Sequence, residues 1–470
     1  FHAMWINPND PDMVLAGSDG GMSYTTTGSS DSWNLMGGMT NTQFYAITID
    51  EQNPQRLYGG TQDNGTNRTL TGSLDDWDHI NGGDGFYVAV DYTNPNVMYA
   101  EYQNGSFRKS VNGGASFFSA MSGIDYSNER HNWNTPFVMD PNDPQILYYG
   151  SNRLYKTTNA AGSWFPISGD LTDGDDPGNL TFGTITTIDV ARTDGDVIYV
   201  GTDDANVWVT TNGGGNWTPI NAGLPTRWIT RVVVDPYDAG TVFVTLSGYT
   251  ERSHTPHIYR STDYGQNWTS IAGNMPDAPI NDVIVDPHDP QTLYIATDFG
   301  VFYTGDLGVN WAPLGTGMPV VPVGDLAFHR VTRSLVAGTH GRSMFRAGVD
   351  CPDPTDSDGD GFNDACDNCP GVPNADQADS NRDWVGDACD ALPCSCPFQA
   401  DLDASGAVDA VDLAVVIDIV FFGAADSQDA QCPRTRADFN ADGVADAVDL
   451  AELIDHVFFG GTGPSDPCVL

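Results

Sequence analysis

Aspartate recurs at alternate positions in two stretches after residue 355, and this spacing is typical of a calcium-binding loop. Calcium takes six to eight oxygen ligands, which positions 1, 3, 5, 9 and 12 of a 12-residue loop supply together with the carbonyl of residue 7. The first stretch offers Asp356, Asp358, Asp360, Asp364 and Asp367, with the carbonyl of Phe362. The second offers Asp379, Asn381, Asp383, Asp387 and Asp390, with the carbonyl of Val385. Trp384 occupies position 6 of the second stretch, where Gly normally permits the sharp turn. This substitution puts the geometry of the turn in question, but it does not change the set of ligands.

A second pair of such loops is duplicated at a constant offset of 37 residues. DLDASGAVDAVDLAVVIDIVFFG (401–423) aligns with DFNADGVADAVDLAELIDHVFFG (438–460), and each loop precedes an amphipathic helix. The ligands would be Asp401, Asp403, Ser405, Asp409 and Asp412 with the carbonyl of Ala407, and Asp438, Asn440, Asp442, Asp446 and Asp449 with the carbonyl of Val444. A solvated acidic run is the plain alternative. The repeated spacing instead predicts about four Ca²⁺ ions in 356–449 and a tail that needs them to fold.

Two carboxylates in the first part of the chain could perform a different chemistry. Hydrolysis of a glycosidic bond needs two carboxyl groups at a fixed separation. Asp63 in TQDNG and Asp84 in GGDG lie on Gly-rich loops after strands, so they are the first pair to test, although 58 Asp residues make any choice of two nearly arbitrary. Trp133 and Trp228 could stack on sugars, or they could belong to the core.

The elements that would carry these residues repeat along residues 1–350. Apolar alternation ending in an acidic or Pro turn recurs every 41–51 residues, and each turn is followed by two or three further short strands. Four-stranded units of this length predict a mainly β fold, a β-propeller of seven or eight blades. The motif S/T-x-D-x-G-x-x-W lies between the third and fourth strands, as in Ser261–Trp268 and Thr304–Trp311. Its residues suit a tight turn and an inter-blade plug, which explains them without catalysis.

Composition excludes several classes of function. The net charge is −44 with a pI near 4.1, and 2 Lys and 17 Arg cannot form a phosphate-binding patch, so no nucleic-acid partner is expected. No apolar run reaches 18 residues, which predicts no membrane insertion. The His residues have no zinc-ligand spacing, so no zinc site is expected. All eight Cys follow residue 350, which indicates disulfides and a secreted, extracellular or cell-surface protein. The domains expected are 1–349, 350–396 and 397–470.

Three families resemble these segments. The S/T-x-D-x-G-x-x-W copies and the stretches 43–65 and 82–105 resemble secreted bacterial propellers with sialidase-type (BNR, Asp-box) repeats, which are related to sortilin-type and xyloglucanase-type propellers. Many of these proteins carry tandem propellers, and Phe1 lies inside a repeat, so we expect further sequence upstream. The eight repeat units would then form either one eight-bladed ring or seven blades plus one blade that belongs to a neighbouring propeller. Residues 356–390 are similar to thrombospondin type 3 repeats, which implies the pairs Cys351–Cys366 and Cys369–Cys389. Residues 401–460 look like a dockerin, which implies a cohesin-like partner.

Two functions compete on this basis. The main hypothesis is a non-catalytic extracellular assembly protein, whose propeller is a binding platform and whose tail docks to a cohesin-like partner or self-associates. The alternative is a glycoside hydrolase of the xyloglucanase or sialidase type with a polysaccharide substrate. Five Glu residues and dispersed Arg argue against a sialidase, and fold alone does not decide the rest.

Overall fold

The computed structural model describes residues 2–18, 21–37, 41–174, 181–248, 256–379, 384–390, 415–417, 419–420, 450–451 and 453–454. The chain divides into two compact units, residues 1–350 and 351–470. Within the described ranges, no helix has the length and apolar character needed to cross a bilayer.

The first unit consists of eight antiparallel sheets, seven with four strands and the last with three, and the strands of each sheet are consecutive in the sequence. The first four sheets comprise β1 (Ala3–Asn7), β2 (Asp10–Ser18), β3 (Gly21–Thr25) and β4 (Asn34–Leu35); β5 (Phe44–Ile49), β6 (Leu57–Thr61), β7 (Gly65–Thr69) and β8 (Trp77–Asn81); β9 (Gly85–Val90), β10 (Met98–Tyr102), β11 (Ser106–Ser110) and β12 (Phe118–Ser119); and β13 (Phe137–Met139), β14 (Leu147–Gly150), β15 (Leu154–Thr157) and β16 (Phe165–Pro166). The last four comprise β17 (Ile185–Val190), β18 (Val197–Thr202), β19 (Val207–Thr211) and β20 (Thr218–Pro219); β21 (Ile229–Asp235), β22 (Asp238–Leu246), β23 (Ile258–Ser261) and β24 (Thr269–Ser270); β25 (Ile280–Asp286), β26 (Asp289–Thr297), β27 (Gly300–Thr304) and β28 (Ala312–Pro313); and β29 (Val323–His329), β30 (Ser334–Thr339) and β31 (Met344–Gly348). A single 3₁₀ turn, η1 (Gln103–Gly105), joins β10 to β11.

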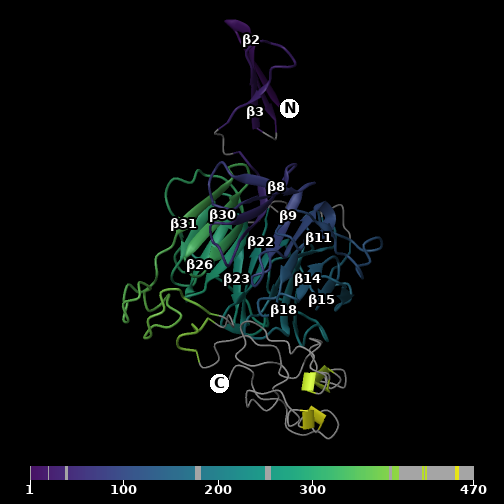
Figure 1. Cartoon of the computed structure of the whole chain (residues 1–470), viewed down its shortest axis with the longest axis vertical. Coiled ribbons are helices and arrows are strands. Elements are labelled where there is room, and N and C mark those ends of the chain that lie inside the picture. Colours follow the sequence, from purple (N-terminus) through teal and green to yellow (C-terminus); the bar gives the residue numbers. More distant parts are fainter. Residues whose placement is uncertain are drawn as a thin grey trace. The chain divides into compact units, whose positions relative to one another are not determined.

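Seven of these sheets, from β5–β8 to β29–β31, close a ring. Their innermost strands are neighbours in the order β5, β9, β13, β17, β21, β25 and β29, and β5 also contacts β29 and β30. Figure 1 shows the last sheet, in green, beside the first ring sheet, in purple-blue. Hydrogen bonds cross the closure, from the N–H of Ile47 to Asp325 Oδ2 (2.7 Å) and from the N–H of Ser343 to the carbonyl of Thr42 (2.9 Å). Of the two predicted blade numbers, the ring therefore has seven.

The sheet β1–β4 has the strand order of a blade but is not one of the ring sheets. Its strands pair with one another in the order β1, β2, β3 and β4. Met4 is 66% exposed and Leu35 is 70% exposed, whereas apolar residues on the ring strands are largely buried. The first repeat unit of the sequence is thus folded as a blade without belonging to this ring.

The acidic turns end the innermost strands as the sequence pattern predicted. The side chains of five turn aspartates accept the backbone N–H two residues further on, at 2.8–2.9 Å: Asp50, Asp91, Asp140, Asp235 and Asp286. An aspartate that satisfies its own turn in this way replaces hydrogen bonds that the strand can no longer make.

The turn between the third and fourth strands has the same hydrogen bonds in five sheets. In Ser261–Trp268, the Ser261 hydroxyl donates to Asp263 (2.8 Å) and accepts the N–H of Gly265 (2.9 Å), and Asp263 accepts the N–H of Asn267 (2.9 Å). The copy at Thr157 keeps this geometry although Ala161 replaces Gly and adopts φ +63°. The tryptophan that follows donates its indole N–H to a carbonyl at the end of the preceding sheet. These pairs are Trp164 to Ala120, Trp217 to Ile167, Trp268 to Ile220 and Trp311 to Ile271, at 2.6–2.9 Å.

Removing one of these tryptophans should destabilise the ring substantially. Trp311 is 5% exposed and packs in the core between two sheets. We expect Trp311→Ala to cost about 3–5 kcal/mol of unfolding free energy, because it leaves a large cavity. Trp311→Phe keeps most of the packing but loses the indole hydrogen bond, and should cost about 1–2 kcal/mol. Urea denaturation of both variants checks this, and equal costs would contradict the packing argument.

The second unit has two disulfides within its described residues, Cys351–Cys366 and Cys369–Cys389. These are the pairs that the resemblance to thrombospondin type 3 repeats implied. Further along, Val416 and Ile417 of the first duplicated segment pack with Leu453 and Ile454 of the second. Because those pairs are 37 residues apart, the two repeats contact each other through equivalent positions.

Candidate functional site

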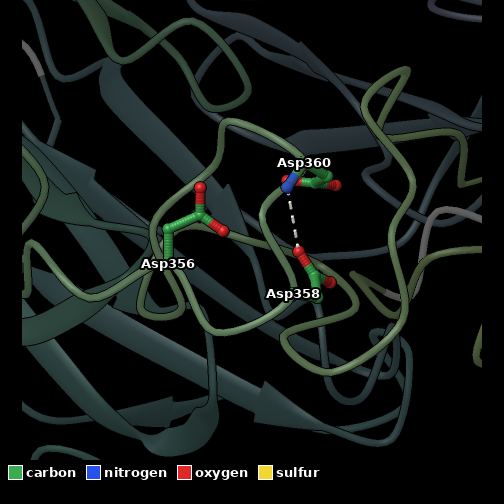
Figure 2. A group of neighbouring side chains, drawn as sticks. All are labelled: Asp356, Asp358 and Asp360. Carbon is green, nitrogen blue, oxygen red and sulfur yellow. Dashed lines mark hydrogen bonds between the residues drawn. The ribbon is translucent and has the colours of Figure 1, made fainter.

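The first aspartate-spaced loop brings three carboxylates together (Figure 2). Carboxylate oxygens of Asp356, Asp358 and Asp360 lie within 4.8 Å of one another. The N–H groups of Gly359 and Gly361 donate to Asp356 at 2.7 and 3.2 Å, which fixes the turn. Burial and repulsion by the neighbouring acids raise the pKa of Asp358.

The oxygen atoms of this loop suit a hard cation. Among the described residues, buried Oδ2 atoms of Asp358 and Asp367 have no hydrogen-bond partner. Asp364 does not join the other three carboxylates directly, because its two oxygens accept the N–H and the hydroxyl of Ser357 at 2.7 and 2.6 Å. Phe362 donates its N–H to Asp360 at 2.9 Å. Unpartnered carboxylate oxygens beside others of like charge are the ligands that Ca²⁺ prefers.

In the second loop, Trp384 occupies the position that Gly361 has in the first. Trp384 adopts φ +77° and donates its N–H to Asp379 Oδ2 at 2.9 Å, as Gly361 does to Asp356. Trp384 thus has the positive φ and the hydrogen bond that Gly361 has in the first loop, while residues 380–383 lie outside the described residues. Asp387 donates its N–H to the carbonyl of Ala378, and Asp390 donates its N–H to the carbonyl of Gly386.

Other predicted calcium ligands lie outside the described residues. They are Asn381, Asp383, Asp401, Asp403, Ser405, Ala407, Asp409, Asp412, Asp438, Asn440, Asp442, Val444, Asp446 and Asp449. Val385 is described and is exposed.

A cavity of about 380 Å³ lies at the centre of the ring, and all seven ring sheets contribute to it. Its lining consists mainly of amide, hydroxyl and aromatic side chains: Tyr45, Tyr87, Asn132, Asn134, Thr186, Trp228, Thr230, Arg231, Asn281, Asp298, Pro322, Gly324 and His340. The residues come from the start of the innermost strands or from the loops at that end. This end of the ring is called the channel mouth below.

Arg231 crosses the channel beneath this mouth. It belongs to β21, forms ion pairs with Asp282 on β25 (2.7 Å) and Asp325 on β29, and donates to the hydroxyl of Tyr87 on β9 (3.1 Å). The two aspartates are almost fully buried. A buried cation with two hydrogen-bonded carboxylates satisfies the charges that this position would otherwise leave unpaired. It also ties four sheets of the ring together.

Aspartates on the inner strands bind the next sheet through its backbone. The hydrogen bonds run from the N–H of Val234 to Asp189, from Leu326 to Asp282 and from Ile47 to Asp325, at 2.7–2.8 Å. Burial is the main cause that raises the pKa of Asp189 and of Asp325 to about 7. The nearby charge of Arg231 opposes this rise in pKa, and the charge of Asp282 adds to it.

The raised pKa of Asp189 predicts a pH-dependent stability. A carboxyl group whose pKa is higher in the folded state contributes stability that is complete below its unfolded pKa near 4 and is lost as the pH rises through 7. The melting temperature should therefore fall between pH 5 and 8. In Asp189→Asn, which keeps a hydrogen-bond acceptor, that fall should be smaller by about 2 °C. Calorimetry at four pH values measures it, with the exposed Asp75→Asn as a control that should behave like the parent protein.

The structure places Asp63 and Asp84 next to each other at the channel mouth. Asp63 lies in the β6–β7 turn with φ +60°, and its N–H donates to Asp84 Oδ1 at 2.5 Å. Asp84 precedes β9, and its own N–H donates to the side chain of Gln103 at 3.1 Å. Burial raises the pKa of the Tyr45 hydroxyl, and so do the nearby charges of Asp84 and Asp63. Tyr45 lines the cavity, whereas Asp63 and Asp84 are not among its lining residues.

Aromatic rings lie beside these carboxylates. Tyr45 stacks on Phe86 with ring centroids 4.6 Å apart, and Phe86 meets Trp133 edge to face at 5.9 Å. Trp133 is 45% exposed, so it is not the core residue that the sequence allowed as an alternative. Trp228 lines the cavity on another sheet. Exposed rings beside carboxylates are suited to binding sugars, whose C–H faces pack on them.

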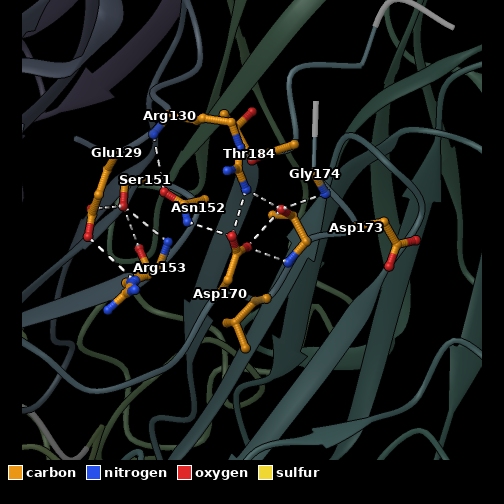
Figure 3. Close-up of polar contacts among 12 residues, drawn as sticks. Glu129, Arg130, Ser151, Asn152, Arg153, Asp170, Asp173, Gly174 and Thr184 are labelled. Atoms are coloured by element: carbon orange, nitrogen blue, oxygen red, sulfur yellow. Dashed lines mark hydrogen bonds and ion pairs between the residues drawn. The ribbon is translucent and has the colours of Figure 1, made fainter. Parts of the chain in front are cut away.

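The loop that carries Trp133 is held by a network of side chains between two sheets (Figure 3). Arg130 donates to Asp170 Oδ2 (2.7 Å), and Asn152 donates to the same atom (2.8 Å). Asn132 donates to the hydroxyl of Thr184 at 2.8 Å. These contacts fix the loop from both sides and so position Trp133 and Asn134 at the channel mouth.

Three residues of the channel mouth were not expected from the sequence: Arg231, Tyr45 and Asn134. Arg231 is one of 17 arginines, and nothing in its local sequence distinguishes it. These residues share one feature that the sequence could have indicated: each lies at the start of an inner strand or in the loop before it. The repeat pattern of the propeller defines those positions.

Comparison with known proteins supports a two-part chain. Residues 399–458 match the dockerin type I domain family, whose members bind calcium. The xyloglucanase of Paenibacillus sp is 27% identical over 186 residues, which cover 34% of this chain and 18% of that protein. The oligoxyloglucan-reducing end-specific xyloglucanase of Emericella nidulans is 27% identical over 174 residues, covering 33% and 19%.

Solved structures show the same fold. The GH74 enzyme of Niastella koreensis has a TM-score of 0.51 at 20% identity and covers 66% of this chain and 53% of its own. The GH74 xyloglucanase from Xanthomonas campestris has a TM-score of 0.52 at 17% identity, covering 66% and 52%. The chain thus spans about half the length of these structures, and its match spans less than a fifth of the curated relatives.

These relatives correct the main functional hypothesis. A non-catalytic assembly protein was expected, but the curated relatives and these structural neighbours are xyloglucanases or GH74 enzymes, which favours the glycoside hydrolase alternative. The expected docking tail agrees with the dockerin match. The first unit of the chain thus has a β-propeller fold like that of these GH74 structures, and residues 399–458 match the dockerin type I domain family.

Proposed function

We propose that this protein is an extracellular glycoside hydrolase that cleaves the backbone of xyloglucan or a similar branched β-glucan. The observation that carries the proposal is the pair Asp63 and Asp84, which adjoin at the channel mouth near the exposed ring of Trp133. Relatives whose names give this activity support the substrate class.

Asp63 and Asp84 would supply the two carboxyl groups of the reaction. One protonates the departing glycosidic oxygen, and the other activates a water molecule or attacks the sugar directly. The N–H of Asp63 and the turn around it hold Asp84 in one orientation. Trp133 would hold a backbone sugar beside the pair, so that the bond to be cleaved is positioned before reaction.

The tail would attach this hydrolase to a partner. A dockerin type I domain implies a cohesin-type protein as partner, and Ca²⁺ would hold its two loops in the folded state. Asp356, Asp358, Asp360 and Asp367 would hold a further Ca²⁺ in the preceding segment, where the ion neutralises crowded carboxylates.

The direct test is hydrolysis by the full chain. We expect reducing ends to accumulate from xyloglucan and more slowly from an unbranched β-1,4-glucan, measured by a reducing-sugar assay and mass spectrometry of the products. Hydrolysis of neither glycan, by a protein whose melting curve shows a folded propeller, would refute the proposal.

A further inference from the structure

We propose that the channel mouth binds a single uncharged sugar residue, which enters end-on as a branch of the glycan whose backbone lies on the rim. The source of the sugar rests on the proposed function, whereas the binding site itself rests on the cavity and its lining.

The size of the cavity limits the occupant to something small. Its volume of about 380 Å³ is at the low end of the roughly 300–1,000 Å³ found for ligand pockets. Arg231 and its partners cross the channel from β21 to β9 and β29. A polysaccharide therefore cannot pass through the ring, but one branch residue can enter from the mouth.

The lining is chemically suited to hydroxyl groups. Asn132, Asn134 and Asn281 offer amides, and Thr186 and Thr230 offer hydroxyl oxygens. The buried Oδ1 of Asn134 has no hydrogen-bond partner among the described residues, so a ligand hydroxyl could donate to it. A buried acceptor that is left unpaired costs free energy, which a bound donor would recover.

The ring of Trp228 and that of Tyr45 complete this lining on two different sheets. Amides that bind hydroxyls, combined with flat apolar faces that pack on C–H groups, are the combination that a sugar ring requires.

Charge at the site disfavours an ionised ligand. The cation of Arg231 is already paired with Asp282 and Asp325. Asp298, the remaining carboxylate of the lining, accepts a hydrogen bond from Asn281 at 3.2 Å. A phosphate or a uronic acid would therefore find the charge of Arg231 already neutralised and a carboxylate nearby, so a neutral sugar is favoured.

The cavity and the carboxylate pair have Tyr45 as a common neighbour at the channel mouth. Tyr45 borders the cavity, and its hydroxyl feels the charges of Asp84 and Asp63. A branch held in the channel would thus fix which backbone linkage lies beside the pair, and the pocket would determine the branching pattern that is accepted.

Binding of free sugars tests the pocket without any need for activity. Saturation-transfer NMR on the full chain should detect xylose, galactose or glucose, and should detect glucuronate at least 5-fold more weakly. Asn134→Ala should weaken binding of the neutral sugar at least 5-fold. The matched control is Asn216→Ala, an exposed Asn on the β19–β20 turn, which should bind as the parent does. Equal binding by Asn134→Ala and the parent, or preference for glucuronate, would overturn the inference.

Kinetics separate this inference from the proposed function. With Asn134→Ala, KM for xyloglucan should rise at least 5-fold, whereas the control Asn216→Ala should keep the KM of the parent protein. If no glycan is cleaved but sugar binding still depends on Asn134, the sugar-binding inference is supported and the proposed hydrolase function is refuted. If the parent protein and Asn134→Ala cleave xyloglucan with the same KM, the sugar-binding inference is refuted and the proposed hydrolase function is supported. Trp228→Leu, followed by the same NMR experiment, provides a second variant if Asn134→Ala does not fold.

Discussion

Replacing Asp84 by Asn should lower the rate of xyloglucan cleavage by about 10²–10⁴-fold, the contribution that one positioned acid or base makes in such reactions. Asn keeps the size of the side chain and an oxygen that can accept the N–H of Asp63, so the turn should remain folded. Asp63→Asn should cause a loss in the same range. Initial rates of reducing-end release measure both, with thermal melting as the check on folding.

The pattern of residual activity assigns the two roles. If a variant lacks the general acid, an aryl glycoside with a good leaving group should restore most of its rate. If it lacks the base or nucleophile, azide should restore the rate instead. The exposed Asp75→Asn of the same sheet is the matched control and should keep full activity. Full activity of both Asp63→Asn and Asp84→Asn would remove this pair from the mechanism.

Much of the propeller could be predicted from sequence because its determinants are local. An aspartate that closes its own turn, as Asp50 does, and a Ser261–Asp263 pair that binds nearby N–H groups act within a few residues. The period of these signals gives the number of sheets. It could not give the number of blades in the ring, because closure depends on β5 meeting β29 across nearly 300 residues.

The candidate site was predictable in part for the same reason. Asp63 and Asp84 are both found at Gly-rich turns, and the ring places those turns at one end. Arg231 has partners on three other sheets, so only the assembled ring shows its role. The preference for an assembly role over catalysis was wrong. Composition and repeats indicate the fold, whereas a catalytic site depends on which side chains the loops of different sheets bring together.

Chelating calcium should have the second large effect, and it should be confined to the tail. With EDTA, we expect amide hydrogen exchange in residues 351–390 and 399–458 to accelerate at least 10²-fold, since the loop carboxylates repel one another without a cation and calcium binding is coupled to folding. Exchange in the ring, residues 44–348, should stay the same. EDTA does not reduce disulfides, so Cys351–Cys366 and Cys369–Cys389 should remain bonded. The faster exchange would then reflect loss of ordered structure in the tail and not loss of its disulfide bonds.

A pair of variants separates the first loop from the general acidity of the tail. Asp356→Asn combined with Asp360→Asn removes two of the three converging carboxylates and should lower the bound calcium from about four ions to about three, measured by competition with a chromophoric chelator. Asp353→Asn is the control, because it also removes one carboxylate charge, three residues before Asp356. Among the hydrogen bonds described, the Asp353 carboxylate accepts only those of Thr355, so this variant should keep all the calcium ions. Because both variants make the tail less acidic, a loss of calcium in Asp353→Asn as large as in the double variant would mean that diffuse charge holds the ions. A loss only in the double variant would mean that the geometry of the loop selects calcium, and the same reasoning then extends to the loops at 401–412 and 438–449.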